Sequence, residues 1–303
     1  MKIRKMKCIV VGGAGFIGSN LVDRLIEDGH QVSVIDNLST GNKENINPKA
    51  TFYERDITLM NDWLMFRDVD TVFHLAAKAR VQPSIEDPVG FDKVNVGGML
   101  NILNACVKHK VRRFVYSSSS SVYGNVDILP TPENYPTNPI SPYALQKLVG
   151  EQYCKLFSEL HDIETVSLRY FNVYGERQLL EGAYCLVMGI FAQQRLNGEP
   201  MTIRGDGEQR RDFTYVGDVV DANIKAAFSY HVGKGEAINI GNGDNRSVNQ
   251  LADMIGGDRI NVDTVIEPKE TLAENDKADT LLDWQPTTKL EDWIVKWKEE
   301  IGL

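Results

Sequence analysis

The chain has 303 residues, of which 42% are hydrophobic and 25% are charged, and its formal net charge is −9. This length and composition are enough for one large or two modest hydrophobic cores. The negative charge argues against general binding to nucleic acid or to an anionic membrane, so an anionic ligand would have to be met by local cations.

The cysteines and the hydropathy pattern indicate a reducing compartment. No apolar run is long enough to span a membrane, and the charged stretch over residues 1–7 precedes a strand without a small-residue cleavage site. The cysteines stand alone in apolar stretches, without the CxxC spacing of a zinc or redox site. We therefore expect a cytoplasmic protein with reduced core thiols and no metal. The residues concerned are Cys8, Cys106, Cys154 and Cys185.

The first predicted element is a buried strand over residues 6–11, followed by a glycine-rich turn and an amphipathic helix. Gly12, Gly15 and Gly18 have the spacing that lets a backbone turn tightly, approach a pyrophosphate and pack the helix on a sheet. The N-terminus of that helix would attract the anion. The pattern predicts a dinucleotide site, and a tight turn without a ligand is the alternative.

A second predicted strand, over residues 31–35, ends in Asp36. A carboxylate about twenty residues after the glycine turn can hold a ribose diol. No arginine follows Asp36 closely, so a 2′-phosphate would be repelled there. The sequence therefore favours NAD over NADP.

Apolar strands continue to alternate with helical stretches. Strands are predicted over residues 71–75, 114–117 and 165–168, with helices around residues 89–109 and after residue 141. This alternation predicts an α/β fold with a Rossmann-type, doubly wound parallel sheet. After Asn172 the elements become shorter and richer in glycine, which predicts a smaller C-terminal α/β part.

Tyr143 and Lys147 are four residues apart on a predicted helix, which places the phenol and the ammonium on one face. A fixed cation can lower the pKa of a phenol from its usual value near 10, so Tyr143 could act as a base. Such a pair also arises by chance, roughly once in a chain like this one. Tyr230 and Lys234 are an example, with Gly233 between them and no companion motif.

Taken together, these segments resemble the extended short-chain dehydrogenase/reductase family, and within it the nucleotide-sugar 4-epimerases, over essentially the whole chain. The matching segments are Gly12 to Gly18, Asp36 to Leu38, Asp56-Ile57, His74 to Ala77, Asn95, Ser117 to Gly124, Tyr143 to Lys147, Arg169 to Asn172, and Arg211 to Phe213. The resemblance implies an NAD-binding Rossmann domain over residues 1–172 and 212–241, and a nucleotide-sugar-binding domain over residues 173–211 and 242–303.

The resemblance also implies which residues contact NAD. Asp56 and Ile57 would meet the adenine, Lys147 the nicotinamide ribose, and Tyr170 with Phe171 the nicotinamide end. The full expected cofactor set is Gly12, Gly15, Phe16, Ile17, Gly18, Asp36, Asn37, Asp56, Ile57, Leu75, Ala76, Ala77, Asn95, Ser117, Tyr143, Lys147 and Tyr170.

The catalytic residues implied by the family pattern are Ser119, Tyr143 and Lys147. Related dehydratases and decarboxylases carry carboxylates just after the serine, whereas this chain has Ser120 and Ser121. Eliminating water needs a second acid/base pair, and epimerisation does not. We expect Tyr143 to take the proton of the sugar 4-hydroxyl while NAD takes the hydride, giving a transient 4-keto sugar.

Arginines and small residues are expected to hold the substrate. Arg211 and Arg246 stand where the family contacts the diphosphate. Thr271 stands six residues before Lys277, where a small residue in relatives accommodates an N-acetyl group. The full expected substrate set is Arg80, Ser119, Ser120, Tyr143, Asn172, Ile203, Arg204, Arg211, Arg246 and Thr271.

Two departures from the family pattern affect the substrate side. The loop before Lys269 is short and lacks an arginine that relatives carry, so a third diphosphate contact is missing or is made by Lys269. Gly189 replaces a common proline, which puts the shape of the uridine pocket in doubt.

The expected activity is 4-epimerisation of a UDP-hexose, preferably N-acetylated, which interconverts UDP-GlcNAc and UDP-GalNAc. The alternatives are a UDP-glucose/UDP-galactose 4-epimerase, an epimerase or reductase acting on a carboxylated UDP-N-acetyl sugar that Lys78 and Arg80 could meet, a 4-ketosugar reductase, and an NAD-binding protein without turnover. The last is disfavoured because the catalytic residues are present. Apolar residues on the two long helices predict a homodimer.

Overall fold

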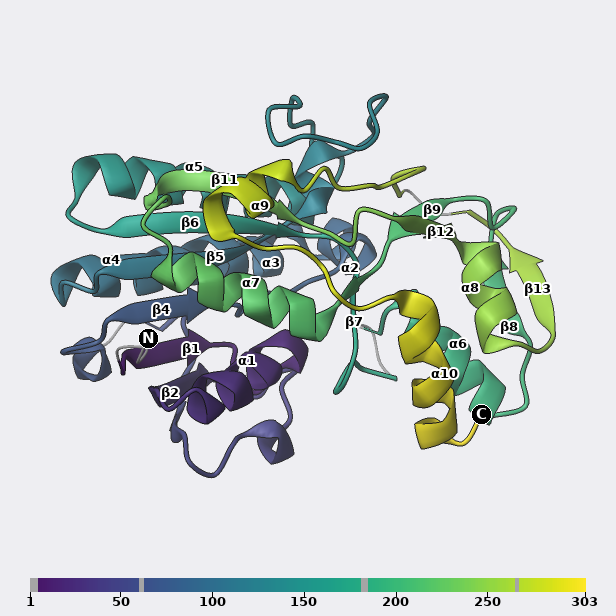
Figure 1. The fold of residues 1–303 in the computed structure, drawn as a ribbon, viewed down its shortest axis with the longest axis horizontal. Helices are drawn as coiled ribbons and strands as arrows, with labels where there is room; N and C mark the ends of the chain where they lie inside the picture. The colour runs from purple at the N-terminus through teal and green to yellow at the C-terminus, as the bar shows by residue number, and fades with distance from the viewer. Residues whose placement is uncertain (1–4, 60–62, 181–184, 265–266) are drawn as a thin grey trace.

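The computed structural model describes residues 5–59, 63–180, 185–264 and 267–303 (Figure 1). Within these residues, seven parallel strands form the central sheet in the order β11-β6-β5-β4-β1-β2-β3. They are β1 (Lys7–Val11), β2 (Gln31–Asp36), β3 (Thr51–Glu54), β4 (Thr71–His74), β5 (Arg113–Ser119), β6 (Glu164–Tyr170) and β11 (Lys234–Ile240). The strand order reverses between β1 and β4, which is where open sheets of this kind bind ligands.

Both faces of the sheet are covered, because successive side chains of a strand point to opposite faces. In β1, Cys8 and Val10 belong to one core with α1 (Phe16–Glu27), α7 (Val216–Phe228) and α9 (Asp276–Leu282). Ile9 and Val11 belong to a second core with α4 (Met99–Lys108) and α5 (Pro142–Leu160). The predicted doubly wound parallel sheet is confirmed.

The helix predicted around residues 89–109 is divided in the structure. It contains α3 (Pro88–Asp92), a π-helical segment η3 (Lys93–Gly98) and α4, and α2 (Val81–Glu86) precedes it. Gly98 explains the close packing of this segment, because a Cβ there would lie 2.6 Å from the Ile57 side chain. Short 3-10 helices connect other elements: η1 (Lys43–Asn45), η2 (Leu64–Phe66) and η4 (Ser120–Tyr123).

A smaller group of elements packs beside the sheet, around α6, α8 and α10 in Figure 1. Phe191, Leu251 and Trp293 are buried in its core. The group contains α6 (Val187–Leu196), α8 (Val248–Ile255), α10 (Leu290–Ile301) and three strand pairs: β7 (Val173–Tyr174) with β10 (Thr214–Tyr215), β8 (Met201–Arg204) with β13 (Arg259–Val262), and β9 (Arg210–Asp212) with β12 (Asn245–Ser247).

The chain crosses between the two parts several times. α9 departs from the predicted domain division. It lies in the segment predicted to belong to the nucleotide-sugar-binding domain, yet its Ala278 and Leu282 pack with Trp284 in a core of the central sheet. The domain boundaries themselves stay a prediction.

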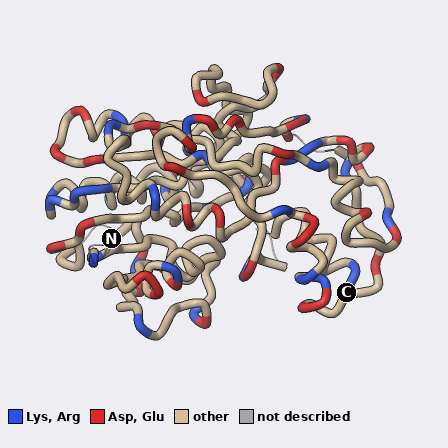
Figure 2. The backbone as a smooth tube through the Cα atoms, viewed as in Figure 1, with Lys and Arg blue, Asp and Glu red and all other residues tan. Residues whose placement is uncertain are grey.

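Figure 2 shows acidic and basic residues interspersed along the fold. Among the described residues, no helix combines the length and apolar character needed to cross a bilayer. All four cysteines are buried.

Candidate active site

The glycine turn after β1 is shaped by close backbone approaches. Gly12 has φ +84°, and a Cβ there would lie 2.6 Å from the Ala76 amide nitrogen. A Cβ on Gly18 would lie 2.1 Å from the Gly12 carbonyl oxygen. In the described structure no side chain caps α1 at Gly15, so its first amides remain available to an anion. The turn therefore fits a pyrophosphate.

Asp36 ends β2 beside this turn and is already oriented. One carboxylate oxygen accepts from the Ala14 amide at 3.0 Å, and the other accepts from the Leu38 amide at 2.8 Å. A carboxylate oxygen can accept more than one hydrogen bond, so both oxygens can still accept from a ribose diol. These acceptors are suited to a ribose diol, and the role of Asp36 as the ribose ligand stays a prediction.

Asp56 and Ile57 come from the loop after β3 and reach the same end of the sheet. The Asn37 amide donates to Asp56 at 3.5 Å, and the Thr58 amide donates to it at 2.8 Å. Burial opposes ionisation of Asp56, but the hydrogen bonds from Thr58 and Asn37 outweigh it and lower the pKa. Asn101 donates to the Ile57 carbonyl at 2.8 Å and fixes that loop. The structure thus brings Asn37 and Asp56 together.

Asn95 fixes the loop after β4, which contains Leu75, Ala76 and Ala77. It accepts from the Lys78 amide at 2.8 Å and donates to the Lys78 carbonyl at 3.0 Å. It also donates to Gln146 on α5 at 2.9 Å. Gln146, which was not among the predicted site residues, therefore connects this loop with the helix that carries Tyr143 and Lys147.

Tyr143 and Lys147 meet the end of β5. Tyr143 is hydrogen-bonded to Ser119, and Lys147 donates to the Ser117 carbonyl at 2.6 Å. The Lys147 ammonium lies 5.9 Å from the centroid of the Tyr143 ring. The three predicted catalytic side chains are therefore gathered at one site.

The expectation of a lowered phenol pKa is wrong for the protein by itself. Burial raises the pKa of Tyr143, and the hydrogen bond from Ser119 offsets this only in part. Burial also lowers the pKa of Lys147 to about 8, although the Glu151 charge opposes that shift. Burial therefore disfavours both the phenolate form of Tyr143 and the Lys147 cation that would stabilise that phenolate.

Behind the pair lies a buried ion pair that the sequence reasoning missed. Glu151 accepts from Arg169 at 2.9 and 2.7 Å and also accepts from the Ser118 hydroxyl. Arg169 in turn donates to the Tyr123 hydroxyl at 2.8 Å. Four-residue spacing from Lys147 places Glu151 on the same helix face, which was the available sequence signal.

Tyr170, at the end of β6, is buried beneath this site. Its hydroxyl donates to Asn223 at 2.9 Å and is hydrogen-bonded to Ser117. Phe171 turns elsewhere and packs with Val122, Tyr123 and Ala273. Ser120 begins η4, and Ser121 donates to the Ser119 hydroxyl at 2.9 Å.

Arg211 and Arg246, the two predicted diphosphate ligands, lie directly opposite each other in the β9–β12 pair. Both are engaged by carboxylates. Arg211 donates to Glu267 at 2.6 Å. Arg246 contacts Asp244 and Glu291, each at 2.7 Å, and these hydrogen bonds raise its pKa against the opposing effect of burial.

Thr271 and Asn172 meet on the same side. The Thr271 hydroxyl accepts from the Asn172 amide at 3.3 Å and from the Asp212 backbone amide at 3.2 Å. Asp212 is fully buried and accepts from the amides of Asn242, Gly243 and Ala273. Burial raises its pKa to about 6 in spite of these hydrogen bonds. Asp212 thus ties three segments around Thr271.

The remaining predicted substrate residues lie nearer to α6. Ile203 on β8 is completely buried, so neither its side chain nor its backbone is exposed to a ligand in this structure. Arg80 donates to the Cys185 carbonyl. Burial lowers the pKa of Arg80, and the nearby positive charge of Arg204 lowers it further. Arg80 and Arg204 are therefore close enough to repel each other.

Comparisons with known proteins place this geometry in a family. The model of the NAD dependent epimerase/dehydratase family matches residues 8–241. A relative from Methanocaldococcus jannaschii is 48% identical over 250 residues, 82% of this chain and 80% of its own length. Among solved structures, UDP-glucose 4-epimerase from Thermotoga maritima, with UDP-glucose, has a TM-score of 0.91 at 38% identity and covers 98% of this chain and 100% of its own.

A second solved structure is UDP-N-acetylglucosamine 4-epimerase from Methanobrevibacter ruminantium, in complex with UDP-N-acetylmuramic acid. It has a TM-score of 0.92 at 36% identity and covers 98% of this chain and 99% of its own. These matches confirm the predicted family, the NAD cofactor and the assignment to the isomerases. The chain belongs to the NAD dependent epimerase/dehydratase family.

Proposed function

We propose that this protein is an NAD-dependent UDP-sugar 4-epimerase. The observation that carries the proposal is the meeting of Tyr143, Ser119 and Lys147 at the end of β5, at the sheet edge that also holds the glycine turn. Ser120 and Ser121 follow Ser119 where a dehydratase would need a carboxylate. This site can move a proton to and from a hydroxyl but has no second acid/base pair beside it in the described loop.

In this proposal Tyr143 accepts the proton of the sugar 4-hydroxyl and later returns it, while Ser119 orients that hydroxyl. NAD, when bound, supplies the acceptor and the donor of the C4 hydride. Lys147 holds positive charge beside the phenol. The keto sugar must present its other face before the hydride returns, so the nucleotide has to be held more firmly than the sugar.

Cofactor content distinguishes an epimerase from a 4-ketosugar reductase. An epimerase regenerates NAD in each turnover, so the purified protein should contain NAD and should interconvert UDP-sugars without added cofactor. A reductase would consume reduced cofactor in proportion to product. Incubation with UDP-GlcNAc, UDP-GalNAc, UDP-glucose and UDP-galactose, followed by chromatography of the products, tests the proposal. No conversion of any of the four would contradict it.

The preferred sugar is proposed to be N-acetylated. Thr271 has a short side chain, and its contacts with Asn172 and the Asp212 amide hold it beside another expected sugar ligand in spite of the short loop. A tyrosine there would fill the space of an acetamido group. Thr271→Tyr should reduce turnover of the two N-acetylated sugars by about five- to 150-fold, because overpacking costs about 1–3 kcal/mol, and should spare UDP-glucose and UDP-galactose.

The ratio of the two activities is the measurement. An equal loss on all four sugars would mean that the substitution damages the fold, for which Thr271→Ser is the matched control. An unchanged ratio with full activity would place Thr271 outside the sugar pocket and would remove the basis for an N-acetyl preference.

Arg80 and Arg204 support a second candidate, a UDP-N-acetyl sugar that carries a carboxylate. Their charges lie close together, and among the described residues neither has a carboxylate within ion-pair distance. The M. ruminantium relative was solved with such a molecule, UDP-N-acetylmuramic acid. If this candidate holds, UDP-N-acetylmuramic acid will bind more tightly than UDP-GlcNAc, and Arg80→Met will remove the difference.

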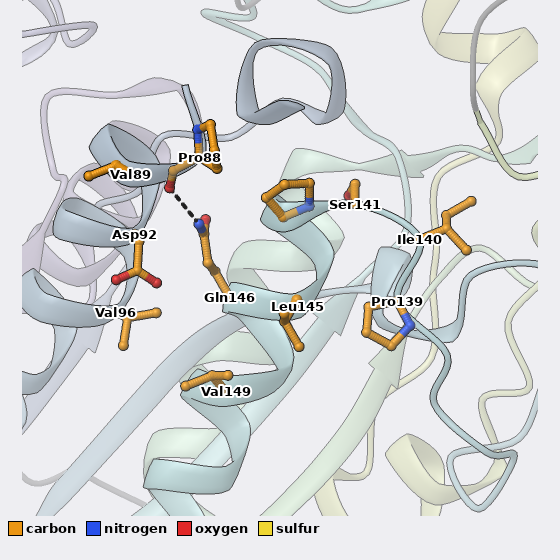
Figure 3. Close-up of a pocket in the computed structure, with 11 residues that line it drawn as sticks. Pro88, Val89, Asp92, Val96, Pro139, Ile140, Ser141, Leu145, Gln146 and Val149 are labelled. Atoms are coloured by element: carbon orange, nitrogen blue, oxygen red, sulfur yellow. Dashed lines mark hydrogen bonds between the residues drawn. The ribbon is translucent and has the colours of Figure 1, made fainter. Parts of the chain in front are cut away.

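We also propose a homodimer. An apolar groove of about 700 Å³ lies between α3, η3 and α5, and Figure 3 shows Val89, Val96, Leu145 and Val149 around it. Val89 is 79% exposed and Leu145 is 52% exposed, which is unusual for neighbouring apolar side chains. A second copy related by a two-fold axis would cover this face with the same helices.

Light scattering tests the dimer. Leu145→Asp should give a mass near 34 kDa, whereas Val295→Asp, a change at an equally exposed position on α10, should leave the dimer intact. A wild-type protein that is monomeric at micromolar concentration would refute the proposal.

A further inference from the structure

The contacts of Arg211 leave one edge of its guanidinium facing a carboxylate. Its Nη1 donates to the backbone carbonyls of Arg210 at 2.8 Å and Lys269 at 3.4 Å, which fixes the group in place. Its Nη2 donates to Glu267 at 2.6 Å. The other carboxylate oxygen of Glu267 accepts from Gln209 at 3.3 Å. Glu267 therefore occupies the edge that a phosphate would use.

Positive charges around β9 and β12 are matched by carboxylates, and Figure 2 shows both signs side by side in this region. The cations are Arg210, Arg211, Arg246 and Lys269, and the four carboxylates around them are Asp244, Glu267, Glu270 and Glu291. Asp212 adds a buried carboxyl group on β9. A diphosphate therefore meets no excess of positive charge here. An anion can bind strongly here only if at least one carboxylate breaks its ion pair with an arginine.

The four carboxylates differ in how firmly they are held. Asp244 is only two residues before Arg246, and the hydrogen bond between them lowers the pKa of Asp244. Glu291 lies in the first turn of α10, where the helix dipole favours its charge. Glu270 accepts from the Asn245 side chain at 2.8 Å as well as facing Arg210. Glu267 lies outside any helix or strand, and its side chain is 34% exposed.

We propose that Glu267 sets the affinity of the protein for the nucleotide diphosphate by occupying Arg211 until the diphosphate replaces it. This inference rests on the proposed function. Arg211 keeps a charge-assisted partner in both states, so the exchange avoids leaving a nearly buried guanidinium unpaired. Breaking the Glu267 contact reduces the net gain from the phosphate contact, which weakens binding of every UDP-sugar alike and leaves the chemistry at Tyr143 unaffected.

Glu267→Gln tests the proposal, because glutamine keeps the shape and an acceptor oxygen but removes the charge. Calorimetric titration of the NAD-loaded protein with UDP should show binding that is tighter by about three- to tenfold. KM for the UDP-sugar substrate should fall by the same factor, and kcat should stay unchanged. The gain should shrink at about 0.5 M salt, since it comes from an uncompensated charge.

Glu270→Gln is the matched control. Glu270 comes from the same loop and has the same 34% side-chain exposure, but it faces Arg210. The UDP affinity of the Glu270→Gln variant should stay within about twofold of the wild-type affinity. Equal gains in the two variants would overturn the proposal in favour of a general electrostatic effect.

Two other outcomes would also overturn it. Unchanged UDP affinity in Glu267→Gln would show that the carboxylate does not compete with the diphosphate, and weaker binding would show that Glu267 holds Arg211 in place for the ligand. Arg211→Met separates these failures from a failure of the proposed function. If wild type binds UDP and Arg211→Met does not, the clamp stands and only the role of Glu267 is wrong. If wild type fails to bind UDP at millimolar concentration, the proposed UDP-sugar function itself is wrong.

Discussion

The cofactor side and the substrate side of the site are held together by different kinds of contact. On the cofactor side, one continuous turn and the strand beside it supply backbone amides, tight glycine contacts and the carboxylate of Asp36. On the substrate side, charged side chains from β9, β12, α10 and the loop before Thr271 meet in pairs. Many of the cations there are already neutralised.

This difference matches two different tasks. The glycine turn has no room for a Cβ, so any rearrangement of its backbone would cost free energy. A rigid turn of this kind suits a ligand that stays bound through many turnovers. Paired charges can exchange one anionic partner for another, so they suit a ligand that enters and leaves. A high density of arginines is therefore not by itself a high affinity for anions, because Arg211 and Arg246 both have carboxylate partners.

Tyr143→Phe, a change where the cofactor side meets the substrate side, should have the largest effect. If the cofactor side is self-sufficient, the variant should keep bound NAD and its fold while losing about 10²- to 10⁴-fold in kcat, the usual contribution of an acid/base group. Tyr230→Phe is the control, because Tyr230 is 97% exposed. Epimerisation near the wild-type rate in Tyr143→Phe, or its loss in a folded Tyr230→Phe protein, would show that the site has been placed wrongly.

Gly18→Ala should have the next largest effect, because it attacks the cofactor side alone. The new Cβ would lie 2.1 Å from the Gly12 carbonyl oxygen, so the turn must open. We expect a loss of about 2–4 kcal/mol of stability and protein that purifies with little NAD. Gly97→Ala, where a Cβ would meet nothing within 4 Å, should keep the wild-type level of NAD and raise the stability by at most about 1 kcal/mol. Retention of NAD at the wild-type level in Gly18→Ala would contradict the preformed turn.

The smallest expected effect concerns Lys147 in the NAD-free protein. Its pKa is about 8 in the folded structure against 10.5 in the unfolded chain, because burial disfavours the charge. The unfolded state therefore binds more protons between these values, and stability rises as the pH increases from about 8 to 10.5. Below pH 8 the charge costs the full amount, so Lys147→Met should be more stable than wild type at pH 7 by about 1–3 kcal/mol.

Urea unfolding of both proteins as a function of pH measures this difference. It should shrink steadily above pH 8, where wild type gains stability and the variant does not. A difference that is independent of pH would mean that the ammonium is not destabilised by burial. The pH dependence of this stability difference shows whether the Lys147 cation depends on bound ligands for stabilisation.

Local sequence determined the parts of this protein that depend on short-range geometry. The glycine spacing, the carboxylate at the end of the second strand and the four-residue spacing of Tyr143 and Lys147 predicted the sheet, the cofactor turn and the catalytic helix, because strand, turn and helix periods are fixed by the backbone. The family resemblance added the partners of these residues along the chain.

Only the tertiary structure decided the electrostatics of the site. The expectation of a lowered Tyr143 pKa was wrong because burial disfavours the charged forms of both the phenol and Lys147. The spacing of two residues in the sequence does not show how deeply their side chains are buried. The pairing of Glu151 with Arg169, and of Arg211 with Glu267, joins positions 18 and 56 residues apart. Charges interact through space and through the dielectric that surrounds them, so their partners and their cost appear only once the chain has folded.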